Sequence, residues 1–191
     1  MLDIMKHIVA LTSACILLVG CAITQQADTL PAGTKPSSTP GISVHVDAGA
    51  MLGAHNRWRA KVGVKPLSWS KKLESIAGVY AVRLASQGCR MQHSRNDYGE
   101  NLFWASPVRW SDGHSELQRV AEAEVVEAWG SEEKDYNYRS NSCSGTCGHY
   151  TQIIWRDTRE VGCAARVCTD SSQIWVCNYN PPGNYRGVRP Y

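Results

Sequence analysis

The sequence predicts an α+β domain held together by three disulfide bonds, and three observations carry this prediction. Apolar residues recur at helical spacing in several segments from residue 47 onwards. After Gly148 the chain changes to short segments rich in β-branched and aromatic residues. Six of the eight cysteines lie beyond residue 47 as well. Helices followed by strands are typical of an α+β fold, and 145 residues can bury a sizeable core.

Three amphipathic helices are expected in the first part of this domain. The first spans residues 47–61, and the second runs from Ser70, its N-cap, to a stop at Gly88. The third covers about residues 115–131, where the apolar positions, Trp129 among them, fall on one side. Its acidic residues are read as a solvated face.

Three strands are expected in the second part: "YTQIIW" at 150–155, "VGCAARVC" at 161–168 and "QIWVCNYN" at 173–180. Trp129 and Trp155 are expected in the core. The chain has seven tryptophans and eight tyrosines against one phenylalanine, an aromatic surface that suits ligand grooves. It contains neither a glycine-rich phosphate loop nor a nucleophile elbow.

The N-terminal segment, residues 1–21, reads as an export signal that starts at Met1 or Met5. Lys6 precedes an apolar run that is too short for a spanning helix, which needs about 20 apolar residues. The run ends in "LVGC", which resembles the lipobox of bacterial lipoproteins. Lipidation at Cys21 would hold the protein on a membrane without a spanning segment.

Residues 22–46 form a linker rich in Thr, Ser, Pro and Gly, and residues 47–191 form the folded domain. We therefore expect an exported protein, either secreted or anchored as a lipoprotein at the outer membrane or cell surface. A membrane would be contacted through the lipid anchor only. The formal net charge of +3 is too small to indicate a nucleic-acid partner.

The six domain cysteines are Cys89, Cys143, Cys147, Cys163, Cys168 and Cys177. An even number in an exported domain predicts three disulfides, but spacing alone leaves fifteen pairings open. The alternative takes "CSGTCGH" as a zinc site with Cys143, Cys147 and His149 as ligands. An oxidising compartment favours the disulfides over zinc.

Five ordered blocks resemble one family: "AHNRWRAKVGVKPLSWS", "HSRNDYGENL", "AWGSEEKDYNY", "GHYTQIIWRDTREVGCA" and "VCNYNPPGNYRG". They are similar to the CAP superfamily (cysteine-rich secretory proteins, antigen 5 and pathogenesis-related proteins), closest to its plant pathogenesis-related members. The resemblance implies an α-β-α sandwich. It also implies the disulfides Cys89–Cys168, Cys143–Cys147 and Cys163–Cys177.

The resemblance further implies a cleft lined by two histidines and two glutamates, here His93, Glu100, Glu132 and His149. Imidazole nitrogens bind transition metals and carboxylates orient the rings, so His93 and His149 are the candidate ligands of a divalent metal such as zinc. No cofactor is required by this reading. A carboxylate beside a histidine can also form an acid/base pair.

Two functions remain open at this stage. The first is an extracellular module that binds a sterol, another lipid or a host ligand, an activity that the resemblance implies. The second is a metal-dependent hydrolase, a protease, that uses the same four residues. No serine or cysteine nucleophile stands out, and no HExxH motif is present, so binding is favoured over catalysis.

The C-terminal stretch "CNYNPPGNYRGVRPY" raises a separate question. In plant relatives a similar tail is released as a signalling peptide, and the equivalent fragment here runs from Pro181 to Tyr191. The favoured alternative is a tail that packs across the sheet with Tyr185 and Tyr191 buried, since Cys177 fixes its start.

Overall fold

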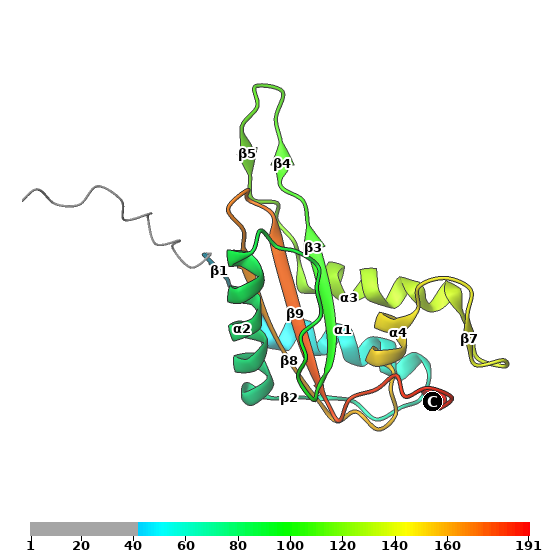
Figure 1. The fold of residues 1–191 in the computed structure, drawn as a ribbon. Helices are drawn as coiled ribbons and strands as arrows, with labels where there is room; N and C mark the ends of the chain where they lie inside the picture. Colours follow the sequence, from blue (N-terminus) through cyan, green and yellow to red (C-terminus); the bar gives the residue numbers. More distant parts are fainter. Residues whose placement is uncertain (1–41) are drawn as a thin grey trace, which may run out of the picture. The chain divides into compact units, whose positions relative to one another are not determined.

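A computed structural model describes residues 42–191 (Figure 1), so the predicted export signal, Cys21 and most of the predicted linker lie outside the described part. Along the chain, the elements of the described part are β1 (Ser43–Val44), α1 (Ala48–Lys61), β2 (Ser68–Trp69), α2 (Lys71–Ser86), β3 (Gly99–Ala105), β4 (Val108–Arg109), β5 (Ser115–Glu116), α3 (Glu122–Gly130), the 3-10 helix η1 (Ser131–Asp135), β6 (Tyr136–Asn137), β7 (Ser142–Cys143), α4 (Gly148–Ile153), β8 (Glu160–Val167) and β9 (Gln173–Asn180).

The main sheet has the strand order β1-β8-β9-β3, and β2 adds a short parallel pairing to the start of β8. The neighbours β8, β9 and β3 run antiparallel. Every residue of β9 except its last is buried. A strand that is buried on both faces belongs in the centre of a sheet that is covered on both sides.

The two faces of β9 contribute to two separate cores. Trp175, Cys177 and Tyr179 pack with residues of α1, α3 and α4. Ile174 and Val176 pack with residues of α2. Because successive side chains of a strand point to opposite faces, this alternation places helices on both sides of the sheet. The fold is therefore the predicted α-β-α sandwich, and Figure 1 shows α2 on one side and α1 on the other.

The N-terminal turn of α2 lies very close to β8. A Cβ atom added to Gly162 would clash with the backbone of Ser70 and Glu74, so this strand position accepts only glycine. Ser70 occupies the N-cap as predicted, although its side chain makes no capping hydrogen bond. Its backbone N–H instead donates to the Val161 carbonyl at 2.9 Å. The helix start is thus fixed by the strand and not by the serine hydroxyl.

The prediction of a strand at 150–155 is wrong, because this segment begins in α4. The β-branched residues suggested a strand, but tertiary contacts outweigh that weak preference. The carbonyls of Ile153 and Trp155 accept hydrogen bonds of 2.7 and 2.9 Å from the guanidinium of the buried Arg59. A buried arginine on α1 therefore satisfies the carbonyls that the end of a helix leaves unpaired.

The third helix is shorter than predicted. It begins at Glu122, because Ser115 and Glu116 pair with Val108 and Arg109 in the β4–β5 hairpin. The hairpin extends beyond the end of β3 (Figure 1). Strand β3 was not predicted, although it supplies one edge of the sheet. Trp129 and Trp155 are buried in the core as expected.

The three disulfides are those that the resemblance implied: Cys89–Cys168, Cys143–Cys147 and Cys163–Cys177. With Cys143 and Cys147 bonded to each other, the zinc site through their thiolates is excluded. Within residues 42–191, no helix has the length and apolar content needed to cross a membrane.

The tail packs only in part as predicted. Tyr191 is half-buried and stacks on Tyr138 with ring centroids 4.6 Å apart, and its ring joins the edge of the core. Tyr185, however, is 55% exposed and was wrongly expected in the interior. It leans against Trp155 at the surface, with ring centroids 6.0 Å apart.

Candidate functional site

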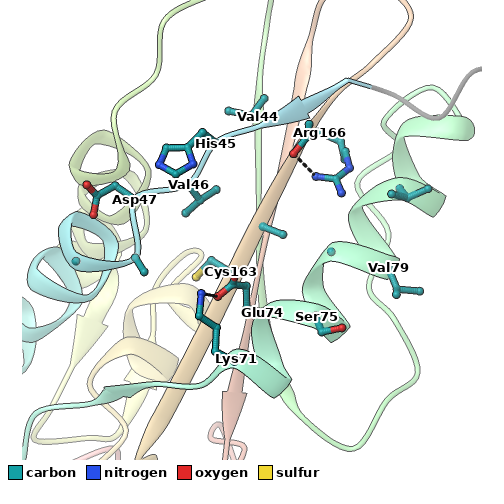
Figure 2. Close-up of a pocket in the computed structure, with 16 residues that line it drawn as sticks. Val44, His45, Val46, Asp47, Lys71, Glu74, Ser75, Val79, Cys163 and Arg166 are labelled. Atoms are coloured by element: carbon teal, nitrogen blue, oxygen red, sulfur yellow. Dashed lines mark hydrogen bonds and ion pairs between the residues drawn. The ribbon is translucent and has the colours of Figure 1, made fainter.

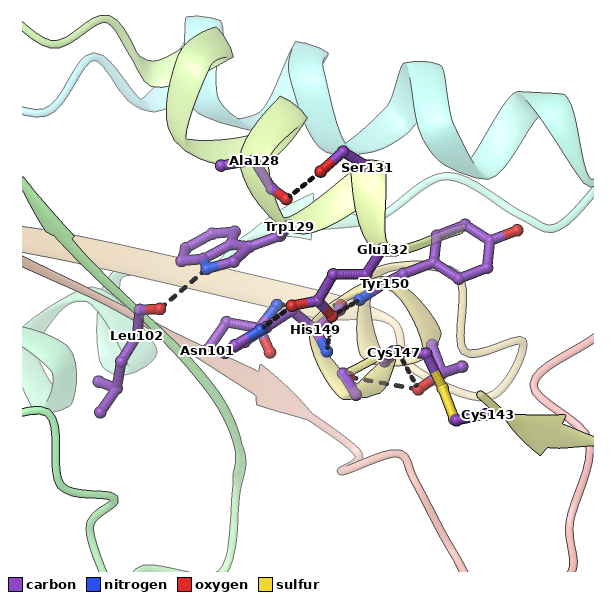
Figure 3. A network of polar contacts seen from close by, with 12 residues as sticks. Asn101, Leu102, Ala128, Trp129, Ser131, Glu132, Cys143, Cys147, His149 and Tyr150 are labelled. Atoms are coloured by element: carbon purple, nitrogen blue, oxygen red, sulfur yellow. Dashed lines mark hydrogen bonds and ion pairs between the residues drawn. A yellow bond between two sulfur atoms is a disulfide. The ribbon is translucent and has the colours of Figure 1, made fainter. Parts of the chain in front are cut away.

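His149 and Glu132 form the first of two histidine–carboxylate pairs among the four predicted cleft residues (Figure 3). The Nδ1 atom of His149 lies 2.6 Å from Glu132 Oε1, and the backbone N–H of His149 donates to Glu132 Oε2 at 2.9 Å. The side chains are 24% and 16% exposed, respectively. One carboxylate thus fixes both the ring and the backbone of His149, while the Nε2 atom makes no hydrogen bond within residues 42–191.

Tight packing at the junction of α3 and η1 positions Glu132. A Cβ atom on Gly130 would overlap the indole of Trp58, so glycine lets α3 approach α1 closely. Trp129 donates from its indole N–H to the Leu102 carbonyl at 2.9 Å and stacks on the His149 ring at 6.1 Å (Figure 3). The adjacent Trp and Gly of "AWGSE" therefore orient the turn that carries the carboxylate.

A buried polar network supports His149 from the side of the sheet. Asn101 of β3 donates from its side-chain amide to the His149 carbonyl at 3.1 Å and to the Tyr179 hydroxyl at 3.1 Å. The same hydroxyl lies 2.8 Å from Nε2 of His55, whose Nδ1 lies 2.8 Å from the Met51 carbonyl. Burial lowers the pKa of His55 to about 4, so this histidine is neutral and structural.

His93 and Glu100 form the second pair. The Nδ1 atom of His93 lies 2.8 Å from Glu100 Oε1, which also accepts the backbone N–H of Ser94 at 2.9 Å. The hydrogen bond to Glu100 raises the pKa of His93 above its usual 6.5. Burial raises the pKa of Glu100, but the hydrogen bonds from His93 and Ser94 together outweigh it and lower that pKa. At neutral pH Glu100 is therefore ionised.

Comparison with known proteins identifies the family. Residues 52–179 match the CAP domain of the cysteine-rich secretory protein family. The chain belongs to this family. A pathogenesis-related protein PR-1 of Medicago truncatula is 46% identical over 136 residues, which cover 70% of this chain and 72% of that protein. The pathogenesis-related protein 1A of Nicotiana tabacum is 43% identical over 142 residues, covering 73% and 78%.

Solved structures show the same CAP fold. The venom allergen-like protein 4 of Schistosoma mansoni superposes with a TM-score of 0.57 at 27% identity, covering 76% of this chain and 95% of that protein. The structure of BmVAL-1 superposes with a TM-score of 0.56 at 25% identity, covering 74% and 79%.

The four predicted cleft residues of the CAP domain thus come together as two pairs, each from two elements. His93 lies in the loop after α2 and Glu100 on β3, whereas Glu132 lies on η1 and His149 on α4. The part of the chain from 42 to 191 contains no group of three or more His, Cys, Asp or Glu side chains placed to hold a metal ion. Each imidazole is nevertheless oriented as a metal-ligating histidine is, with Nδ1 on a carboxylate.

A groove of about 790 Å³ lies apart from the two pairs, between residues 43–49 and α2 (Figure 2). Its apolar lining comes from Val44, Val46, Val79, Val82 and Ala164, and its charged rim includes Lys71, Glu74 and Arg166. Lys71 and Glu74 are paired at 2.9 Å. Sequence reasoning missed this groove, because it forms only where the strand β1 and the helix α2 both flank β8.

Sequence reasoning also missed Asn101 and Tyr179 as supports of His149. Both lie inside the quoted blocks, in "GENL" and "CNYN". The signal that could have revealed them is a polar residue in a segment that otherwise fills the core, because buried polar groups require partners.

Proposed function

We propose that this CAP-domain protein is an exported binding module that holds a sterol, another lipid or a similar apolar extracellular ligand. The groove between residues 43–49 and α2 carries the proposal. Its volume of about 790 Å³ falls in the range of small-molecule sites, about 300–1,000 Å³. Its lining combines valines with charged and polar side chains, a mixture that suits an amphipathic molecule with an apolar part and a polar end.

The chemistry of the domain also favours binding over covalent catalysis. All six domain cysteines form disulfides, so no thiolate nucleophile is left among residues 42–191. Both histidines of the candidate cleft are held by carboxylates, and no serine hydroxyl hydrogen-bonds to either imidazole in the described part.

Filling the groove tests the proposal. Gly78 of α2 lines it, and a Cβ atom there would meet its nearest neighbour, Ala164, at 3.8 Å, so Gly78→Leu should fit the helix and occupy the groove. Gly53→Leu on α1 is the matched control, since its nearest neighbour is also 3.8 Å away and it does not line the groove. We would use the full chain with Cys21→Ser, purified without detergent.

Retention of radiolabelled cholesterol and of a labelled fatty acid is then measured for the three proteins. The proposal expects retention by the parent chain and by Gly53→Leu, and a loss with Gly78→Leu. Equal retention by both glycine variants, each with unchanged circular dichroism, would show that lipid binds elsewhere. No retention by the parent chain would reject the function itself.

The second candidate is a metal-dependent hydrolase, favoured by the two histidine–carboxylate pairs. Zinc could be ligated through Nε2 of His93 and His149, with Glu100 and Glu132 orienting the rings, and it would supply an activated water. Parallel assays of peptide cleavage with and without zinc distinguish the two functions. Zinc-dependent cleavage that disappears in a His93→Ala, His149→Ala double variant would favour the hydrolase.

We further propose that the chain is anchored to a membrane through a lipidated Cys21, on the basis of the sequence from Lys6 to Cys21. Mass spectrometry of the N-terminal peptide from a membrane fraction tests this. A mature chain that begins with acylated Cys21 is expected, and an unmodified N-terminus at Met1 or Met5 would reject it.

A further inference from the structure

A second, smaller cavity of about 360 Å³ lies between α2 and the loop that follows it. Tyr80 and Arg83 of α2 line one side together with Gln87, the C-cap residue of that helix. Gln92, His93 and Arg95 of the loop line the other side. This cavity shares no residue with the groove of Figure 2. Its polar lining consists largely of side chains that donate hydrogen bonds.

The loop after α2 is held by the domain's own covalent and hydrogen bonds, without a ligand. Cys89 at its start is bonded to Cys168. The Tyr80 hydroxyl donates to the Gln92 carbonyl at 2.6 Å, and the backbone N–H of Ser94 donates to Glu100 at 2.9 Å. Arg83 stands on a helix and Arg95 on this anchored loop, so the backbones that present the two guanidinium groups are ordered. A preorganised site loses less entropy when it binds.

The positive charge of the cavity is not neutralised by the domain itself. Within residues 42–191, the side chains of Arg83 and Arg95 form no ion pair within 4.0 Å and donate no hydrogen bond. Two carboxylates, those of Asp97 and Glu100, lie close to Arg95 in the sequence. Glu100 is turned inward, its side chain only 5% exposed and engaged with His93 and Ser94, and Asp97 does not line the cavity.

We propose that this cavity binds an anion with several oxygens, of the phosphate or sulfate monoester class, through Arg83 and Arg95. Guanidinium groups present paired N–H donors that match such oxygens, and the side-chain amides of Gln87 and Gln92 add neutral donors. The assignment goes beyond the lipid-binding proposal, because Arg83 and Arg95 lie outside the groove of Figure 2 and their binding of inorganic phosphate can be tested alone.

An adjoining hollow of about 500 Å³ gives the anion a second possible source. It shares Tyr80, Arg83, Ser94 and Arg95 with the cavity and adds Ile76 and Val79 of α2. This apolar hollow shares Ser75 and Val79 with the groove of Figure 2. Val79 is 72% exposed, so apolar surface lies directly beside the arginines. The anion can therefore be free or can be the headgroup of an amphiphile whose chain lies along Ile76 and Val79.

Calorimetric titration of the full chain carrying Cys21→Ser tests the proposal, with a chelator present so that no metal at His93 contributes. The probes are inorganic phosphate, dodecyl phosphate below its micellar concentration, and uncharged dodecyl maltoside. The site variant is Arg83→Gln, Arg95→Gln. The matched control is Arg57→Gln, Arg119→Gln, which removes the same charge from two exposed arginines outside both cavities.

Binding of a phosphate probe that weakens about tenfold or more in the site variant, but not in the control, is expected. If both phosphates bind equally well, the free anion suffices; if dodecyl phosphate binds more tightly, the headgroup of an amphiphile is the better match. Either result supports the site. An equal loss of phosphate affinity in both double variants would show that binding depends only on the net charge of the protein, and it would overturn the proposal. Absence of phosphate binding, or equal binding of dodecyl maltoside and dodecyl phosphate, would overturn it too.

Discussion

The carboxylate of Glu132 holds His149 at two points, the ring Nδ1 at 2.6 Å and the backbone N–H at 2.9 Å. A carboxylate on Nδ1 fixes the tautomer and directs the free Nε2 outward, which is how proteins prepare imidazole to bind a metal. His93 has the same ring contact with Glu100, whose carboxylate accepts the backbone N–H of the next residue, Ser94. The domain thus repeats one orienting contact on two separate pairs of elements.

Zinc binding is the first prediction from these pairs. We expect weak binding that is lost in the His93→Ala, His149→Ala double variant, because two imidazoles without a third protein ligand form an open site. Affinity should fall as the pH drops, since a protonated imidazole cannot ligate, and the raised pKa of His93 makes the loss begin above pH 6.5.

Isothermal titration calorimetry at several pH values measures this binding. The variant His45→Ala is the control, because it removes an exposed histidine that has no carboxylate partner among residues 42–191. Zinc binding that survives in the double variant would show that the pairs are not ligands.

The second prediction concerns the pKa of His93. The hydrogen bond to Glu100 raises this pKa, so the stability linked to protonated His93 is fully present below pH 6.5 and is lost as the pH rises through the folded-state value. Glu100→Gln should move the pKa of His93 back down. An NMR titration of the imidazole protons measures it, with the exposed Glu127→Gln as control. An unchanged His93 titration in Glu100→Gln would contradict the assignment.

The third prediction is acid destabilisation through His55. Burial lowers its pKa from 6.5 to about 4. Below pH 6.5, therefore, His55 binds a proton in the unfolded chain but stays neutral in the folded domain. Stability contributed by the neutral ring is therefore complete above pH 6.5 and declines as the pH falls towards 4. Between pH 7 and pH 5 the linked loss is about 2 kcal/mol. Denaturant unfolding of the parent and of His55→Gln should show a shallower pH dependence in the variant; identical slopes would refute this origin.

The disulfides should differ in their effect on stability. Cys89–Cys168 closes a separation of 79 positions and Cys143–Cys147 one of 4. Chain entropy assigns about 4.5 kcal/mol to the long loop and about 2 kcal/mol to the short one. Replacing each pair by alanines should therefore lower Tm by roughly 5–10 °C more for the long bridge. Calorimetry decides, and a larger loss from the short bridge would reverse this order.

The parts of the fold that the sequence predicted are those in which local pattern and tertiary environment agree. The apolar stripe of α2 faces the sheet, and the β-branched run of β9 lies at its centre. The prediction of a strand at 150–155 was wrong because Arg59, about 90 positions earlier in the chain, caps α4 through the carbonyls of Ile153 and Trp155. No local pattern contains such a contact.

Short sequence motifs predicted which residues belong to the candidate site but not how those residues pair. The four cleft residues were named from the quoted blocks, but their division into two pairs depends on how β3 and η1 are placed. Arg83 and Arg95 lie twelve positions apart, and no motif in the sequence connects them. Their shared cavity appears only once the Cys89–Cys168 bridge fixes the loop between them.

The last prediction concerns the C-terminal tail, which is held at its far end by Tyr138. Arg189 donates to the carbonyls of Tyr138 and Arg139, and its guanidinium lies 5.2 Å from the Tyr138 ring centroid. Tyr191 stacks on the same ring, and the Pro190 carbonyl accepts the Arg156 N–H at 2.7 Å. A protease must open these contacts before it can release the fragment from Pro181 to Tyr191.

Tyr138→Ala removes the ring that both Arg189 and Tyr191 contact, which should cost about 1–2 kcal/mol of the free energy that keeps the tail packed. When the cleavage rate follows the population of the opened tail, release should become about tenfold faster. Trp110→Ala is the matched control, because Trp110 is an aromatic residue of similar exposure, 52%, that lies outside the tail and makes none of its contacts. Mass spectrometry follows the fragment during incubation with plant apoplastic fluid, beside a cleaved plant homologue. The parent tail should stay intact because the contacts of Tyr138 keep it closed. Rapid cleavage after Asn180 in the parent, at the rate seen in Tyr138→Ala, would mean that those contacts do not protect the tail.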